Sequence, residues 1–292
     1  MKVAIYGRNF DSGFKEYVKR FFEILIKNNI EITIYKKFFD FLIKEIDLDP
    51  QLVSVYTKHV EIKNNVSLLF SIGGDGTILD AITLVRDSNI PILGLNTGKL
   101  GFLASISKDE IEPALDAVFN NDYEIDERSL LKLESSSGLF KEFPYSLNEI
   151  AVQKVDSAMI TVHAYIDNEF LNSYWADGLL VSTPTGSTAY SLSVGGPIIV
   201  PQSGNFIISP ISPHNLTVRP IVLRDTSKLQ LKLEGRSLNY ILSLDHRSIM
   251  IKNTEEIIIT KAEFKVKLVK LNRTSFYNTL RNKLMWGIDK RN

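Results

Sequence analysis

The sequence Gly73-Gly74-Asp75-Gly76-Thr77 indicates how the first half of the chain folds. Residues 66–72, directly before it, are mostly apolar, which predicts a short buried strand. Apolar residues then recur at positions 78, 79, 82 and 85, and this spacing predicts a helix. The glycines therefore lie at a strand-to-helix turn, which in an open parallel sheet is where ligands bind.

The residue types in this turn suggest chemistry as well as binding. Glycines let the backbone approach a phosphate closely, and the helix N-terminus adds partial positive charge. Asp75 would weaken phosphate binding if binding were its only task, so its carboxylate suggests a proton acceptor or a metal ligand. An ordinary tight turn with a polar tip remains the alternative. The dinucleotide fingerprint fails at Leu79, and residues 94–100 do not fit a P-loop.

Composition limits the class of protein. The chain has 292 residues, 34 basic and 34 acidic side chains, 44% hydrophobic residues and no cysteine. A net charge of zero predicts no general attraction to nucleic acid or to a membrane surface, and no apolar run reaches the ~20 residues of a membrane-spanning helix. The first residues read as a strand, not as a signal peptide, so we expect a cytoplasmic protein.

The pattern changes near residue 122. Before it, strands and helices alternate, which predicts a doubly wound α/β domain over residues 1–122. After it, short strands predict a β-sandwich domain over residues 123–272. A helix in residues 273–292 is expected to dock back on the first domain. In the second domain, strands are expected at 130–133, 145–152, 159–166, 178–182, 205–208, 229–233, 240–244, 256–260 and 264–269.

Four further stretches carry candidate functional residues. They are the glycine-punctuated loop 98–103, the pair Asn148-Glu149, the hydroxyl-rich block 175–197 and the turn Asp245-His246-Arg247. Hydroxyl groups suit purine edges and ribose because they both donate and accept hydrogen bonds. The four histidines show no mutual metal-ligand spacing, so no metal site is predicted from them.

Together with the glycine–aspartate turn, these stretches resemble the NAD kinases, which phosphorylate the adenosine 2′-hydroxyl of NAD. The resemblance extends over almost the whole chain, and the Asn-Glu pair with Ser182-Thr183-Pro184-Thr185-Gly186-Ser187-Thr188-Ala189-Tyr190 makes it specific. It implies an α/β domain and a β-sandwich domain with the active site in the cleft between them. It further implies Mg²⁺ or another divalent cation, ATP or another phosphoryl donor, and a homodimer or homotetramer.

The resemblance also implies roles for individual residues. Asp75 matches the general base. The predicted binding residues are Gly74, Gly76 and Thr77 at the phosphates, Phe102 beside the adenosine, Asn148 and Glu149 on the dinucleotide, Thr185, Thr188, Ala189, Tyr190, Ser191, Leu192 and Ser193 in the adenine and ribose segment, and Asp177 and His246 as further substrate contacts.

Three features depart from the family pattern. Trp175 stands where many members have a basic residue, residues 157–159 lack the basic or imidazole side chain that is common there, and His246-Arg247 replaces the more usual Gly-Gln. We hypothesise that this pair supplies some of the missing positive charge. Two other functions compete with the NAD kinase interpretation: a lipid kinase of the diacylglycerol or sphingosine type, which shares only the glycine–aspartate turn, and a non-catalytic dinucleotide sensor, which would have no use for Asp75.

Overall fold

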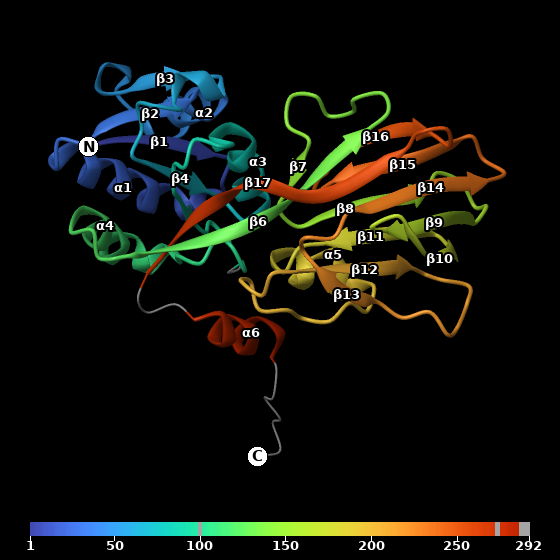
Figure 1. Ribbon diagram of the computed structural model, residues 1–292. Helices are drawn as coiled ribbons and strands as arrows, with labels where there is room; N and C mark the ends of the chain where they lie inside the picture. The colour runs from blue at the N-terminus through green and yellow to red at the C-terminus, as the bar shows by residue number, and fades with distance from the viewer. Residues whose placement is uncertain (99–100, 272–274, 286–292) are drawn as a thin grey trace, which may run out of the picture. The chain divides into compact units, whose positions relative to one another are not determined.

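The computed structural model describes residues 1–98, 101–271 and 275–285 (Figure 1). The chain divides into two compact units: unit 1 contains residues 1–127 and the C-terminal residues from 266, and unit 2 contains residues 128–265. The predicted loop residues Lys99 and Leu100, and the outer parts of the predicted C-terminal segment (residues 273, 274 and 286–292), lie outside the described residues.

Unit 1 is built on a parallel sheet. Its strands are β1 (Lys2–Gly7), β2 (Glu31–Tyr35), β3 (Ser54–Tyr56), β4 (Leu68–Ile72) and β5 (Ile92–Leu95). They lie in the order β5-β4-β1-β2-β3, and the last part of β17 (Ile257–Lys270) runs parallel to β5. The chain passes outward from β1 to β3 and then returns to the other side of β1 as β4. The strand order therefore reverses between β1 and β4, and this is the place in such a sheet where ligands bind.

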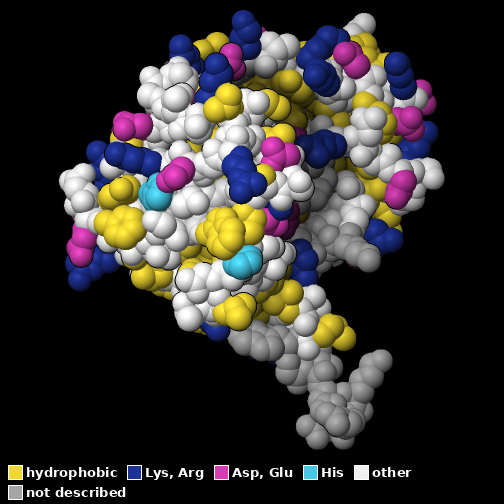
Figure 2. Space-filling view, turned by 90° about the vertical axis from the view of Figure 1, so that its right-hand side faces the viewer, with side chains coloured by type: hydrophobic (Ala, Val, Ile, Leu, Met, Phe, Trp, Pro, Cys, Tyr) yellow, Lys and Arg dark blue, Asp and Glu magenta, His cyan; other side chains and the backbone are white. Residues whose placement is uncertain are grey.

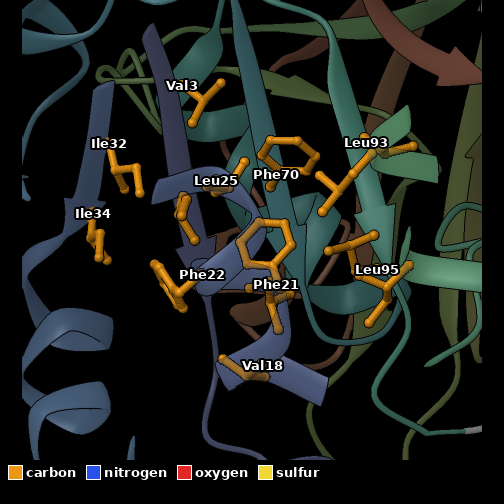
Figure 3. Packing of buried hydrophobic residues seen from close by; sticks show 14 of the residues in the cluster. Val3, Val18, Phe21, Phe22, Leu25, Ile32, Ile34, Phe70, Leu93 and Leu95 are labelled. Atoms are coloured by element: carbon orange, nitrogen blue, oxygen red, sulfur yellow. The ribbon is translucent and has the colours of Figure 1, made fainter. Parts of the chain in front are cut away.

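Helices cover both faces of the unit 1 sheet, as the alternating pattern predicts. They are α1 (Lys15–Lys27), α2 (Lys36–Ile46), α3 (Asp75–Val85) and α4 (Ile111–Phe119), with short 3₁₀ turns at Ser12–Phe14, Pro50–Leu52, His59–Glu61 and Lys108–Glu110. Apolar residues of α1, including Phe21 and Leu25, pack on alternate residues of the strands, such as Ile32 and Phe70 (Figure 3). Residues of α2 and α4 join this core, whereas Ile78 of α3 contacts the other face at Gly94.

Unit 2 contains two sheets that share one apolar core. One is antiparallel and consists, in spatial order, of β13 (Ile221–Arg224), β12 (Asn205–Ile211), β11 (Gly178–Ser182), β8 (Glu149–Lys154), β15 (Asn239–Leu244) and β16 (Arg247–Lys252). The other contains β10 (Glu169–Ala176), β9 (Ile160–Ile166), β14 (Leu229–Gly235), the first part of β17, the larger part of β6 (Glu124–Ser135) and β7 (Tyr145–Ser146). Residues from both sheets, such as Val152 and Val162, fill the core between them. This is the β-rich second domain that the strand pattern predicts.

Several predicted strand bounds are wrong in detail. The strand expected at 145–152 is two strands, interrupted at Leu147 and Asn148, whose N–H groups donate to the Asp245 carboxylate instead of to a ladder. The two strands expected at 256–260 and 264–269 are the single strand β17. Strands β3, β10, β13 and β16 were not predicted.

The C-terminal helix is present as α6 (Phe276–Leu284). Its residue Leu280 is only 2% exposed, and its Lys283 lies beside Asp75 and Phe102 of unit 1. No helix in the described part of the chain is long and apolar enough to cross a membrane. Lys, Arg, Asp and Glu side chains alternate with hydrophobic ones on the face drawn in Figure 2, in keeping with the net charge of zero.

Candidate active site

The turn between β4 and α3 places Asp75 at the start of a helix. Gly73 has a φ of 151°, which side chains rarely adopt, and a Cβ at this position would overlap the Thr77 hydroxyl. Gly74 is the N-cap of α3, and its carbonyl accepts the N–H of Thr77 at 2.9 Å. Asp75 is thus the first residue of α3, where the helix dipole favours a negative charge.

The loop after β5 holds the Asp75 carboxylate. The Phe102 N–H donates to Oδ2 at 2.8 Å, and the N–H groups of Leu103 and Ala104 donate to Oδ1 at 3.1 and 2.9 Å. Gly101 permits this approach, because a Cβ there would overlap Oδ1. Hydrogen bonds to an ionised group are stronger than neutral ones, so these three donors fix the orientation of the carboxylate. The structure therefore brings the predicted residues Asp75 and Phe102 together.

A cation from the end of the chain lies beside the same carboxylate. Lys283 Nζ is 4.0 Å from Asp75 Oδ2 and 4.6 Å from the centroid of the Phe102 ring. The buried side chain of Leu280 anchors the preceding turn of α6. Lys283 was not identified from the sequence, where its one signal is a basic residue in the last turn of a terminal helix.

In unit 2, several predicted residues meet at one end of the six-stranded sheet. Glu149 begins β8 and pairs with Ser182 at the end of β11, while Ile150 pairs with Leu244 at the end of β15. Asn148 precedes Glu149, the segment from Thr183 onward follows β11, and the turn Asp245-His246 follows β15. The neighbouring strands thus place the Asn-Glu pair, the hydroxyl-rich segment and His246 at the same sheet end.

Asp245 organises the backbone at this sheet end. It has a φ of 53° in the two-residue turn between β15 and β16, and its carboxylate accepts the N–H groups of Leu147, Asn148 and Glu149 at 3.0, 2.7 and 3.2 Å. Burial raises the pKa of the Asp245 carboxyl, although these three donors act in the opposite direction. These three hydrogen bonds come from backbone N–H groups, so they shape the start of β8.

The Glu149 carboxyl lies in a different environment. Burial, together with the nearby Asp245 charge, raises the pKa of Glu149 to about 8, although a hydrogen bond from the Tyr190 backbone lowers it. Its Oε2 is buried and has no hydrogen-bond partner among the described residues. A carboxyl group with this pKa is mostly protonated at pH 7, so it can donate a hydrogen bond to a ligand. Such a shifted group is a candidate functional residue.

The hydroxyl-rich segment forms the 3₁₀ turn Thr185–Thr188 and the short helix α5 (Tyr190–Ser193). Buried Arg128 donates from Nη1 to Thr185 Oγ1 at 3.2 Å, and Thr188 Oγ1 donates to the Thr185 carbonyl at 3.2 Å. Gln153 Nε2 donates to the Tyr190 hydroxyl at 3.1 Å. Of the other predicted residues, Ser191 is buried, Ala189 and Leu192 are half-buried and Ser193 is exposed. Arg128 and Gln153 were not identified from the sequence.

The remaining predicted residues occupy two other places. Asp177 joins β10 to β11, and its Oδ1 lies 2.6 Å from Lys154 Nζ. His246 is exposed in the turn before β16. The guanidinium of Arg247 donates to the carbonyls of Phe143 and Tyr145, so it stabilises the chain before β8.

No three His, Asp or Glu side chains gather as metal ligands within residues 1–98, 101–271 and 275–285. A divalent cation that is held mainly by substrate phosphates, as Mg²⁺ commonly is, fits this donor set because it needs few protein ligands. Asp75 is the acidic side chain of the glycine turn.

Family models account for both units. Residues 3–123 match the ATP-NAD kinase N-terminal domain, and residues 147–271 match the ATP-NAD kinase C-terminal domain. Relatives named NAD kinase include those of Cytophaga hutchinsonii, 46% identical, and Flavobacterium psychrophilum, 43% identical; each alignment covers 100% of both chains.

Solved structures support the same assignment. An NAD kinase from Archaeoglobus fulgidus in complex with ATP is 26% identical with a TM-score of 0.74, and the match covers 98% of this chain and 99% of that one. Yeast NADH kinase complexed with NADH is 23% identical with a TM-score of 0.88, over 99% of this chain and 88% of that one, and it shares the fold. The resemblance seen in the sequence is thus confirmed, and the chain belongs to the NAD kinase family.

Proposed function

We propose that this protein transfers a phosphoryl group from ATP to the adenosine 2′-hydroxyl of NAD, giving NADP, with Asp75 as the general base. The arrangement of the Asp75 carboxylate is the observation that carries this proposal. An ionised carboxylate offers about four acceptor positions. Three are filled by the N–H groups of Phe102, Leu103 and Ala104, which leaves one for a substrate hydroxyl.

The expected mechanism depends on orientation and charge. Phosphoryl transfer requires alignment of the attacking hydroxyl with the phosphorus atom and neutralisation of phosphate charge. Asp75 accepts the hydroxyl proton, and its three backbone donors keep it from rotating away. The backbone at Gly74, Gly76 and Thr77 approaches the phosphates. Mg²⁺, bound with ATP, would supply further positive charge at the phosphate oxygens.

The predicted residues of unit 2 serve the dinucleotide in this proposal. The protonated Glu149 carboxyl donates a hydrogen bond to an acceptor on NAD. This bond would give the buried Oε2, which has no partner among the described residues, a hydrogen-bond partner. Asn148, Tyr190 and the hydroxyls of Thr185 and Thr188 contact adenine and ribose, assisted by Ala189, Ser191, Leu192 and Ser193. Asp177 and His246 remain predicted substrate contacts.

Three finer points also remain predictions: the domain bounds at residues 122 and 272, a cytoplasmic location, and a homodimer or homotetramer. The family assignment does not favour the lipid kinase. The dinucleotide sensor is disfavoured by the oriented carboxylate, because binding alone needs no proton acceptor.

The proposal is tested by incubating the purified protein with NAD, ATP and Mg²⁺ and identifying the product by chromatography and by its 2′-phosphate ³¹P resonance. We expect NADP to form. Diacylglycerol and sphingosine, offered in place of NAD, test the lipid kinase. If NAD binds but no NADP forms with ATP or polyphosphate, the proposal is wrong and the sensor replaces it.

A further inference from the structure

Unit 1 contains a cavity that the family resemblance did not point to. It has a volume of about 470 Å³ and lies where β1 and β2 end, lined by residues that include Tyr6, Arg8, Asn9, Tyr35 and Lys37. Ligand sites commonly have volumes of 300–1,000 Å³. The cavity lies at the carboxyl ends of two parallel strands, next to the β1–β4 position where the strand order reverses.

Arg8 connects this cavity to the glycine turn. Its Nε and Nη2 lie 2.8 and 2.6 Å from the carboxylate of Asp80, a residue of α3. Its Nη1 lies 3.8 Å from the point that a Cβ on Gly76 would occupy. Asp80 therefore holds the guanidinium in place while Nη1 remains able to bind an anion beside the Asp75 loop.

Aromatic rings form another part of the cavity wall. The Tyr6 and Tyr35 rings are 5.1 Å apart, and the Tyr6 hydroxyl donates to Asp80 at 3.0 Å. Burial and the Asp80 charge raise the pKa of this hydroxyl, so it stays protonated. Beneath them, Phe38 packs on Gly7, where an added Cβ would lie 2.5 Å from the ring. The aromatic wall is thus held by packing and a hydrogen bond.

We propose that this cavity binds the nucleoside triphosphate donor, with its base against the Tyr35 ring and its phosphates on Arg8 and Lys37. The combination of an aromatic face and two cations matches a nucleotide, whose base stacks and whose phosphates carry negative charge. Arg8 Nη1 lies beside Gly76 of the glycine turn, so it can contact a terminal phosphate that reaches this turn. This inference rests on the proposed function, because it names the site of the donor.

The test measures binding of the non-hydrolysable ATP analogue adenylyl imidodiphosphate with Mg²⁺ to the full chain, by calorimetry without NAD. Arg8→Ala is expected to weaken binding about tenfold or more, since a charge-assisted contact is lost. Lys37→Ala is expected to weaken it about three- to tenfold. Lys36→Ala is the matched control: Lys36 is the neighbouring lysine, it pairs with Asp40, and it does not line the cavity. Its affinity should stay within about twofold of the wild type.

Two further arms identify the ligand. Tripolyphosphate has no base, so its affinity should fall in Arg8→Ala but not in Tyr35→Leu. The affinity of the analogue should fall in both variants, and an analogue affinity that is unchanged in Tyr35→Leu would mean that only the phosphates are recognised. Thermal melting shows that each variant is folded. Unchanged affinity for the analogue in folded Arg8→Ala and Lys37→Ala, or weakened binding of NAD instead, would overturn the proposal. If the wild type binds the analogue here but makes no NADP, the proposed function fails while this site stands.

Discussion

The two units treat a carboxyl group in opposite ways. In unit 1, Asp75 receives three backbone hydrogen bonds and has a lysine nearby. In unit 2, Glu149 is buried near the negative charge of Asp245, its pKa is raised to about 8, and its Oε2 has no partner among the described residues. The first environment orients an acceptor, and the second creates a donor. The same functional group can therefore serve as the base in one unit and as a binding group in the other.

The largest effect is expected when the acceptor of unit 1 is removed. Asp75→Asn replaces one carboxylate oxygen with an NH₂ group, which cannot accept the proton of a hydroxyl. We expect kcat for NADP formation to fall about 10²–10⁴-fold, the usual contribution of a general base. Calorimetry should show NAD affinity within a few-fold of the wild type, because most of the proposed NAD-binding residues are in unit 2 and the substitution keeps Phe102. Retention of most activity by the folded variant would contradict the proposed base.

A smaller loss is expected when the carboxylate is kept but displaced. Gly101→Ala inserts a Cβ that overlaps Asp75 Oδ1, so the loop or the carboxylate must move. We expect kcat to fall about 10–100-fold, because small misplacements of a reacting group are costly. Gly98→Ala in the same loop is the control, since among the described residues its Cβ would meet only Asn96 Oδ1, at 4.0 Å. Equal effects of the two substitutions would show that loop flexibility, not the Asp75 contact, is responsible.

These contacts mark the limit of what the sequence could predict. The strand, turn and helix around Asp75 follow from local apolar spacing, and the structure places them as expected. The donors from residues 102–104 and the approach of Lys283 depend on distant segments, and no local pattern encodes them. Likewise, the sequence identified Glu149, but the shift in its pKa depends on burial and on Asp245, which is far away in the chain.

The strands that were not predicted share one property. Strands β3, β10, β13 and β16 each lie at the end of a strand order, where only one neighbour pairs with them. Many of their residues are exposed, as in β16, where only Ile251 is buried. Edge strands can carry polar residues on much of their surface, so the apolar signal used for strand prediction is weak there. Interior strands such as β11, buried at every residue, were predicted at the correct bounds.

The raised pKa of Glu149 makes the free energy of unfolding depend on pH. Because its pKa is raised from 4.5 to about 8, the folded state keeps a proton that the unfolded state releases, and this contribution to stability is lost as the pH rises from about 4.5 to about 8. Glu149→Gln, which keeps a neutral donor, should flatten this dependence in denaturant titrations at pH 5–9. Its NAD affinity should stay within about threefold, whereas Glu149→Ala should bind about tenfold more weakly. Weak binding by both variants would mean that NAD requires the ionised carboxylate.

The smallest effect is expected at Lys283, because its nitrogen is 4.0 Å from Asp75 and both side chains are about one-third exposed. Solvent screens such a pair, so its contribution is about 0–1 kcal/mol. Lys283→Met keeps an apolar chain near Phe102 but removes the charge, and we expect kcat to change by about two- to fivefold, with a weaker dependence on salt. Arg281→Met in the same helix, whose partner is Asn278, is the control. A loss as large as that of Asp75→Asn would show that orientation by the backbone is insufficient, and that the base of unit 1 needs a neighbouring cation to act.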